Sequence, residues 1–290
     1  MFSARHLFLN HIGQTTDHPL AIEIERAEGV FLYDTDGKDY LDLVSGVSVS
    51  NVGHRHPRVV EAIREQVDRH MHLLVYGELV QSPQVRFAEL LLDQLPKKFD
   101  NIYFVNSGSE ANEGALKLAK RYTGRTEIIA CHHAYHGSTH GVMSLMGEEK
   151  FRNPFRPLLP DVRYIQFNDE ADLQHITERT ACVMVEPIQA EAGIILPKND
   201  YLKKLRKRCD DTGTLLIFDE VQTGFGRTGS LFAMLKYGVY PDIFTIAKAM
   251  GGGMPTGAFV ASKTIMDSLK QAPGLGHITT FGGHPVSVAA

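Results

Sequence analysis

The sequence has little net charge and no long apolar run. Its 30 basic and 34 acidic residues give a formal net charge of −4, and no long run of one sign occurs in the 290 residues. Nucleic acid is therefore not an expected partner, because proteins that bind it carry basic patches. No apolar run approaches the ~18 residues that span a bilayer, so we expect no membrane segment.

The sequence also has few cysteines. Cys131, Cys182 and Cys209 are widely spaced and form no C-x-x-C pair, so we predict buried thiols of a reducing compartment, with neither disulfides nor zinc ligands. Residues 1–14 have no sustained apolar core and no small-residue cleavage site, so no signal peptide is expected. We predict a soluble, cytoplasmic protein, long enough for one large domain or two smaller ones.

Alternating strand and helix patterns predict the α/β class, with a largely parallel sheet and helices on both faces. Before them, apolar and polar residues alternate around turn signals in 22–43, which predicts a small β-meander. No internal repeat or low-complexity linker interrupts the chain. The helical patterns lie at 57–71, 85–95, 106–124 and 200–213, and the strand patterns lie at 101–105, 127–131, 181–185, 215–218 and 243–247.

The ends of one helix and two loops are also expected. Asp200 is placed to cap the helix at 200–213, and Gly213 closes it. Residues 46–56, rich in Gly, Ser and Val, and the proline-punctuated residues 147–161 are predicted to be loops.

Two reactive side chains end neighbouring apolar runs. Asp219 and Lys248 are 29 residues apart, about the length of one strand-helix-strand unit. We therefore expect them on adjacent parallel strands, at the carboxyl edge where open α/β sheets bind ligands. The small residues of 106–113 open a helix directly after a strand, and exposed N–H groups at such a turn favour an anion, best a phosphate.

Other strand ends bring further groups to the same edge. A single strand-end side chain is usually solvated or salt-bridged, and Tyr135 alone fits a core aromatic equally well. Five such groups in consecutive units supply an anion cradle, an aromatic plate, a carboxylate and an amine. Pyridoxal phosphate, a phosphorylated aromatic aldehyde with a basic ring nitrogen, would use them all. The groups are residues 107–109, Tyr135 with His136, Glu186, Asp219 with Gln222, and Lys248.

The motifs that carry these residues resemble the class III, or ω-amino, pyridoxal-phosphate aminotransferases, which include acetylornithine, ornithine and 4-aminobutyrate aminotransferases. The resemblance runs from about Gly29 to the last residue. It implies a fold type I transferase with a three-layer α/β/α large domain at 51–283, after an N-terminal segment at 1–50. The matching motifs are SGSEANE at 107–113, YHG at 135–137, EPIQ at 186–189, DEVQTGFGRTG at 219–229 and KAMGGG at 248–253.

The resemblance implies a role for each matching residue. Lys248 is similar to the lysine that forms a Schiff base with the cofactor and moves the substrate proton, and desolvation is expected to lower its pKa. Asp219 is similar to the carboxylate that keeps a proton on the pyridine nitrogen. The other expected cofactor-binding residues are Ser107, Gly108 and Ser109 in the phosphate cradle, Tyr135 and Val221 on the ring faces, Gln222 at the phenolic oxygen, and His136 and Glu186 beside them.

Three further positions concern the substrate and a second subunit. Thr280 matches a threonine that reaches the phosphate of the neighbouring subunit's cofactor, which implies a homodimer with shared sites. Glu191 matches a glutamate that gates the substrate site, although two alanines flank it where the family usually has glycine. Val47 stands where relatives place a small or aliphatic residue against the substrate chain.

The resemblance implies a ping-pong aminotransferase that moves an amino group from an ω-amino or α-amino donor to an oxo acid such as 2-oxoglutarate. No metal ion is expected. Racemisation, aminomutation or decarboxylation on the same scaffold is an alternative, as is a truncated, weakly active chain. The family continues into a small C-terminal domain that carries an arginine for the substrate α-carboxylate. That domain is expected to be missing, and residues 284–290 to start the helix toward it.

Two patterns suggest other chemistry. Residues 224–229 fit G-x-G-x-x-G, but they do not follow the strand directly and no helical pattern opens at the third glycine, so a dinucleotide site is not predicted. His132, His136 and His140 have the spacing of metal ligands on a helix, but the intervening glycines favour a loop. A metal hydrolase is therefore the less favoured alternative.

Overall fold

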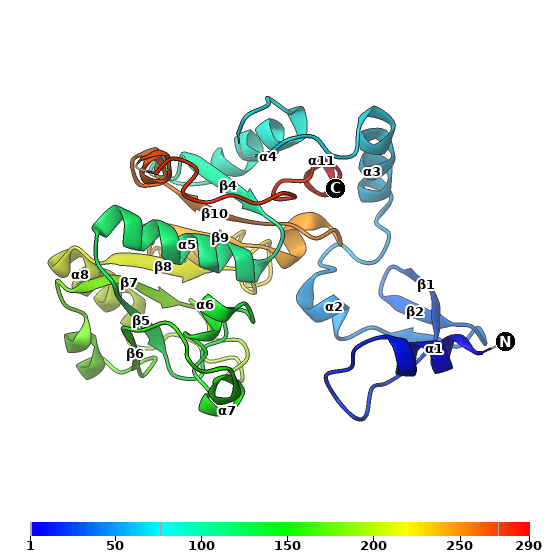
Figure 1. Ribbon diagram of the computed structural model, residues 1–290, viewed down its shortest axis with the longest axis horizontal. Helices are drawn as coiled ribbons and strands as arrows, with labels where there is room; N and C mark the ends of the chain where they lie inside the picture. Colours follow the sequence, from blue (N-terminus) through cyan, green and yellow to red (C-terminus); the bar gives the residue numbers. More distant parts are fainter. Residues whose placement is uncertain (1, 76, 272) are drawn as a thin grey trace.

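The computed structural model describes residues 2–75, 77–271 and 273–290, which form a large α/β part and a smaller N-terminal part (Figure 1). The large part contains a seven-stranded sheet in the order β4-β10-β9-β8-β7-β5-β6. Five neighbouring strands of this sheet, β9, β8, β7, β5 and β6, are parallel to one another. Strand β10 is antiparallel to both β4 and β9. The predicted α/β class with a largely parallel sheet is confirmed.

The strand predictions hold, and two strands were missed. The missed strands are β6 (Val162–Ile165) and β10 (Gly257–Ala261), short runs that directly follow a long loop and a glycine-rich turn. The predicted meander consists of β1 (Ile24–Glu28), β2 (Phe31–Asp34) and β3 (Asp39–Leu41). The other strands are β4 (Asn101–Val105), β5 (Glu127–Cys131), β7 (Thr180–Val185), β8 (Leu215–Asp219) and β9 (Ile243–Ile246).

The main helices are α3 (Pro57–Arg69), α4 (Ser82–Leu92), α5 (Gly108–Thr123) and α8 (Tyr201–Thr212). The shorter helices are α1 (Ala4–His11), α2 (Ser45–Ser48), α6 (His140–Met143), α7 (Glu149–Arg152), α9 (Ala233–Tyr237), α10 (Lys263–Met266) and α11 (Pro285–Ala289). Short 3₁₀ turns are η1 (Asn153–Phe155), η2 (Ala171–His175), η3 (Lys248–Gly251) and η4 (Asp267–Lys270). Helix α11 starts where a helix was expected and packs against α3 and α4.

Four local predictions need correction. Helix α4 begins three residues earlier than predicted, because Pro83 in its first turn favours a helix start, and it ends at Leu92. Residues 147–161 are not all loop, since they contain α7 and η1. Residues 46–56 are not all loop either, since the first three belong to α2. Asp200 stands at the N-cap of α8 but does not cap it: its backbone is left-handed, with φ 58°, and its carboxylate pairs with Lys203 Nζ at 2.9 Å.

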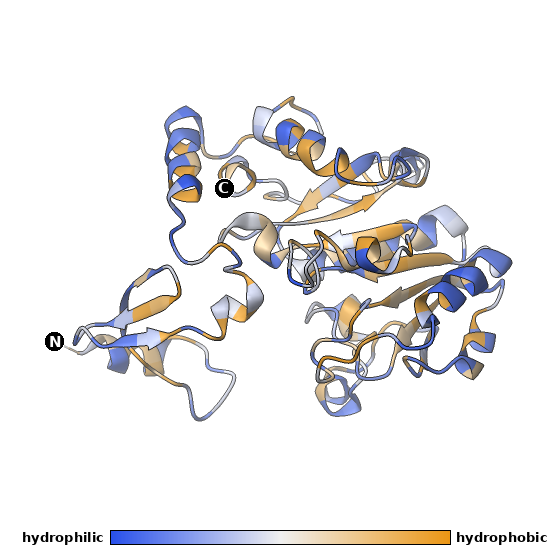
Figure 2. Ribbon diagram, turned by 180° about the vertical axis from the view of Figure 1, so that it is seen from behind, coloured by the Kyte–Doolittle hydropathy of each residue, from blue (hydrophilic) through white to orange (hydrophobic). Residues whose placement is uncertain are grey.

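Helices cover both faces of the large sheet and create two cores. Leu216 and Phe218 of β8 face the core shared with α8, whereas Ile217 faces the core shared with α5. This alternation follows from the period of two along a strand. Figure 2 shows hydrophobic residues along these strands and hydrophilic residues on the exposed helices. The expected three-layer arrangement is confirmed.

The three cysteines are free and buried, as predicted. Within residues 2–75, 77–271 and 273–290, no helix combines the length and apolar character needed to cross a membrane.

Candidate active site

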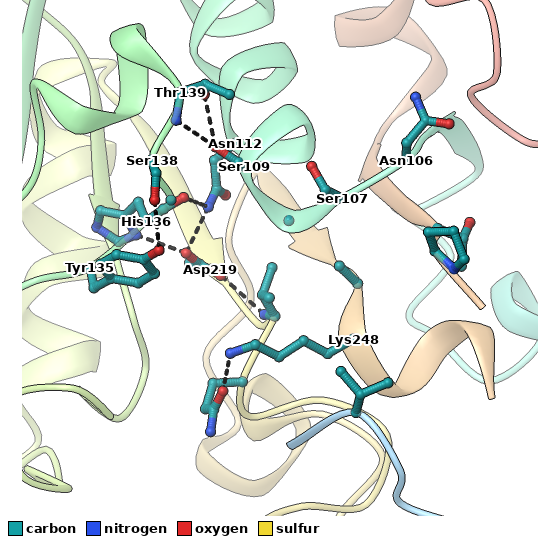
Figure 3. A pocket seen from close by; sticks show the side chains of 18 of the residues that line it. Asn106, Ser107, Ser109, Asn112, Tyr135, His136, Ser138, Thr139, Asp219 and Lys248 are labelled. Carbon is teal, nitrogen blue, oxygen red and sulfur yellow. Dashed lines mark hydrogen bonds and ion pairs between the residues drawn. The ribbon is translucent and has the colours of Figure 1, made fainter. Parts of the chain in front are cut away.

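The carboxyl ends of several strands open into one pocket of about 620 Å³ (Figure 3). The pocket brings together most of the residues predicted from the sequence, although they come from five separate segments of the chain. Those that line it are Ser107, Gly108, Ser109, Tyr135, His136, Glu186, Glu191, Asp219, Val221, Gln222 and Lys248.

Asp219, the last residue of β8, is buried and holds three hydrogen bonds. Asn112 Nδ2 donates to its Oδ2 at 2.8 Å, and His136 Nδ1 lies 2.8 Å from the same oxygen. The Val221 N–H donates to Oδ1 at 3.0 Å. Burial alone lowers the pKa of His136, but the hydrogen bond and the charge of Asp219 outweigh it, so this pKa is raised above its usual value. His136 thus acts as a hydrogen-bond donor that orients the carboxylate.

Lys248 follows β9, directly beside the strand that carries Asp219, as predicted from their spacing. Its ammonium group donates to Gln222 Oε1, and Gln222 Nε2 donates in turn to Ser48 Oγ at 2.8 Å. Burial lowers the pKa of Lys248 from its ordinary value, although the charges of Asp219 and Glu191 oppose this effect. Burial therefore makes the neutral amine, the form that accepts a proton or attacks a carbonyl carbon, easier to reach than in an exposed lysine.

The N-terminus of α5 forms a cradle suited to an anion. Helix α5 is 16 residues long, and its N-cap Ser107 accepts a hydrogen bond from the Glu110 N–H at 3.2 Å. A Cβ at Gly108 would lie 2.8 Å from Val221 Cγ1, so only glycine permits this close approach. The unpaired N–H groups and the helix dipole attract negative charge, as a phosphate group requires.

Glu186 and Tyr135 lie on another side of the pocket. The Glu186 carboxyl group accepts hydrogen bonds from the Tyr135 N–H at 3.2 Å and from the Ala190 N–H at 3.1 Å. Burial, with a smaller contribution from the charge of Asp219, raises the pKa of Glu186 to about 7. The Tyr135 ring is 40% exposed, and its hydroxyl lies 3.0 Å from Ser138 Oγ, so one ring face is available to a ligand.

These groups fit pyridoxal phosphate. The α5 N-terminus suits its phosphate, the buried carboxylate of Asp219 suits a protonated ring nitrogen, and the partly buried amine of Lys248 suits its aldehyde carbon. The close approach of Val221 to Gly108 leaves an apolar surface beside the cradle, suited to a ring face.

Two predicted site residues lie outside the pocket. Val47 is 57% exposed in a left-handed turn at Gly46 and Val47, with φ values of 60° and 61°, and Val49 lines the pocket in its place. Thr280 is exposed and does not line the pocket of its own chain, so its expected contact with a neighbouring subunit stays a prediction.

The sequence reading missed Asn112, Ser138 and Thr139, which all line the pocket. Thr139 Oγ1 lies 2.8 Å from Ser109 Oγ and donates to Glu113 Oε1 at 2.7 Å. A weak signal existed for Asn112, because it is a polar residue on the apolar face of α5. No local pattern distinguishes Ser138 and Thr139 from ordinary loop residues.

Neither the glycine pattern at 224–229 nor the histidine pattern at 132–140 forms the kind of site that its spacing suggested. No helix opens within 224–229, and α9 begins only at Ala233. His136 pairs with Asp219, whereas His140 Nε2 lies 2.9 Å from the carbonyl oxygen of Pro157. In the part of the chain that the structure describes, no three His, Cys, Asp or Glu side chains form a group that would hold a metal ion.

Comparison with known proteins agrees with this geometry. The model of the family Aminotransferase class-III matches residues 12–290. The chain is 44% identical to the acetylornithine aminotransferase of Methanocaldococcus jannaschii over 279 residues, covering 93% of this chain and 68% of that protein. It is 41% identical to the acetylornithine aminotransferase of Bacillus cereus over 286 residues, covering 98% and 71% respectively.

Solved structures are similar over almost the whole chain. The ornithine aminotransferase of Toxoplasma gondii superposes with a TM-score of 0.90 at 30% identity, over 98% of this chain and 67% of that one. An (S)-enantioselective ω-transaminase of Thermomicrobium roseum gives a TM-score of 0.90 at 31% identity, over 98% and 71%. The fold and the pocket thus define a pyridoxal-phosphate-dependent transferase of fold type I. Within that class, the chain belongs to the class-III aminotransferases, which confirms the predicted family, cofactor and amino-transfer chemistry.

Proposed function

We propose that this aminotransferase takes the terminal amino group of an ω-amino acid such as N-acetylornithine and delivers it to an oxo acid such as 2-oxoglutarate. Support for this donor comes from the relatives at 41–44% identity, which are acetylornithine aminotransferases. The observation that carries the chemistry is the position of Asp219 and Lys248 at the ends of adjacent parallel strands, beside an anion cradle.

Each pocket residue has a proposed task. Pyridoxal phosphate, when bound, would supply an electron sink for the pair released at the carbon that carries the transferred amino group. Lys248 would hold the cofactor and then, as a neutral amine, would move a proton away from that carbon. Asp219 keeps the proton on the ring nitrogen. Ser107, Gly108 and Ser109 hold the phosphate, Tyr135 and Val221 pack on the ring faces, Gln222 binds the phenolic oxygen, and His136 and Glu186 support the site.

Substrate entry and assembly are part of the same proposal. Glu191 lines the pocket in an exposed position, where it gates the substrate. Val47 does not line the pocket, and its contact with the substrate chain stays a proposal made from the sequence. Thr280 serves the site of a second subunit in a homodimer. The N-terminal segment (1–50), the large domain (51–283), the start of a further helix (284–290) and a cytoplasmic location remain proposals made from the sequence.

Glutamate formation tests the function. Purified protein is incubated with pyridoxal phosphate, 2-oxoglutarate and one of three donors: N-acetylornithine, ornithine or 4-aminobutyrate. We expect glutamate, fastest with N-acetylornithine, and a loss of at least about 10²–10⁴-fold in Lys248→Ala. Donor consumption without glutamate would favour racemisation, aminomutation or decarboxylation instead.

Mixed dimers test the role of Thr280. Lys248→Ala and Thr280→Ala chains are each nearly inactive if Thr280 completes the partner's site. In a mixed dimer, one site then carries both changes and the other carries neither, so mixing is expected to restore activity. Mixing without any recovery, with dimer formation verified by sedimentation, would contradict a shared site.

A further inference from the structure

Thr245 lies outside the pocket but is linked to Asp219 by a chain of buried hydrogen bonds. Thr245 of β9 pairs in register with Asp219 of β8. Its hydroxyl donates to Asn112 Oδ1 at 2.6 Å, and Asn112 Nδ2 donates to Asp219 Oδ2 at 2.8 Å. All three residues are buried, Thr245 completely. The chain therefore connects three separate elements, β9, α5 and β8, without access to water.

The amide of Asn112 has one favourable orientation in this chain. Its NH₂ group faces two acceptors, Asp219 Oδ2 and the carbonyl oxygen of His136 at 2.7 Å. In the reversed orientation, the amide oxygen would face these two oxygens and lose both bonds. The Thr245 hydroxyl then supplies the donor that Oδ1 needs, because a buried amide oxygen without a partner is unfavourable.

This arrangement makes the two oxygens of Asp219 different. Oδ2 receives Asn112 Nδ2 and His136 Nδ1, whereas among the described residues Oδ1 receives only the Val221 N–H. A carboxylate oxygen accepts about two hydrogen bonds, so among the described residues Oδ2 is saturated and Oδ1 retains one site. The three donors also hold the carboxylate in one orientation.

We propose that Thr245 is a positioning residue for amino transfer: it fixes Asn112 so that Asp219 Oδ2 is saturated and Oδ1 accepts the proton of the cofactor's ring nitrogen. The inference rests on the proposed role of Asp219. Loss of the Thr245 hydrogen bond leaves Asn112 and the Asp219 carboxylate less firmly oriented, so the pairing of Asp219 with the protonated ring nitrogen weakens. The ring nitrogen then holds its proton less strongly, and the electron sink weakens.

Two substitutions at Thr245 separate this role from simple packing. Thr245→Val keeps the shape and removes the hydroxyl, whereas Thr245→Ser keeps the hydroxyl and removes a methyl group. The readout is the ¹⁵N chemical shift of the ring nitrogen in protein loaded with ¹⁵N-labelled pyridoxal phosphate, with kcat and KM for the same samples. We expect Val to shift the resonance toward the unprotonated nitrogen and lower kcat about two- to tenfold at unchanged KM, and Ser to resemble the wild type.

Wild-type resonance in Thr245→Val, or the same shift in Val and Ser, would overturn the proposal. If Thr245→Val does not fold, Asn112→Ser decides: a wild-type resonance there overturns it equally, and a shift toward the unprotonated nitrogen supports it. Asp219→Asn tests the role of Asp219 at the ring nitrogen separately from the role of Thr245. If this variant leaves the ring resonance unchanged, the proposed role of Asp219 itself fails, whatever the result at Thr245.

Discussion

Thr139 binds the Ser109 side chain through two atoms. Its N–H donates to Ser109 Oγ at 3.1 Å, and the two hydroxyl oxygens are 2.8 Å apart. Because Thr139 Oγ1 donates its own hydrogen to Glu113 Oε1, the Ser109 hydroxyl is the donor between the two. The loop after β5 is thereby attached to the first turn of α5, where the anion cradle lies.

Loss of the Thr139 hydroxyl is expected to weaken cofactor binding. Thr139→Val leaves Ser109 without its side-chain partner, and the loss of one hydrogen bond of about 0.5–1.5 kcal/mol should raise the Kd for pyridoxal phosphate roughly two- to tenfold. Thr139→Ser retains the hydroxyl and should bind like the wild type. Absorbance titration of the cofactor-free protein measures both, and equal Kd values for Val and Ser would contradict the prediction.

Glu186 makes stability depend on pH. Its pKa rises from 4.5 to about 7 because the carboxyl group is buried. Between these values the folded protein binds more protons than the unfolded chain, so stability falls as the pH rises through this window. The loss is on the order of 3 kcal/mol at most. Urea unfolding of the cofactor-free protein from pH 5 to pH 8 should show this slope, and Glu186→Gln should flatten it; parallel curves would refute the assignment.

Gly114 permits the close packing of α5 on β10. A Cβ at this position would overlap the ring of Phe259, so Gly114→Ala forces the helix or the ring to move. Overpacking costs about 1–3 kcal/mol, which outweighs the ~1 kcal/mol that alanine gains over glycine within a helix. Gly13→Ala is the control, since no atom of the described residues outside its own neighbours lies within 4 Å of its new Cβ. Urea unfolding should show destabilisation only for Gly114→Ala.

Glu220, next to Asp219, connects the end of β8 to the start of α9. It is completely buried, and its carboxyl group accepts the N–H groups of Ala233 at 2.9 Å and Met234 at 2.7 Å, at the start of α9. Glutamine offers one acceptor oxygen in place of two. Glu220→Gln is therefore expected to cost about 1–3 kcal/mol in urea unfolding. A variant as stable as the wild type would show that these bonds contribute little.

The strand ends were predictable because the information is local. Apolar runs of four to six residues indicate buried strands. The spacing between Asp219 and Lys248 fits one strand-helix-strand unit. The same dependence on local sequence explains the wrong predictions. Aspartate is a common N-cap residue, but the backbone of Asp200 is left-handed, and its side chain pairs with Lys203 instead of capping the helix.

The sequence by itself determined the α/β class, the adjacency of the two strands that end near Asp219 and Lys248, the cofactor and the aminotransferase family, since each depends on residue types and spacings in short motifs. Only the tertiary structure decided that Val49 and not Val47 faces the pocket, and that Asn112, Thr139 and Thr245 support the site. Asn112 meets Thr245 across 133 positions of sequence. Such contacts depend on how β9, α5 and β8 pack together, which no local pattern of residues encodes.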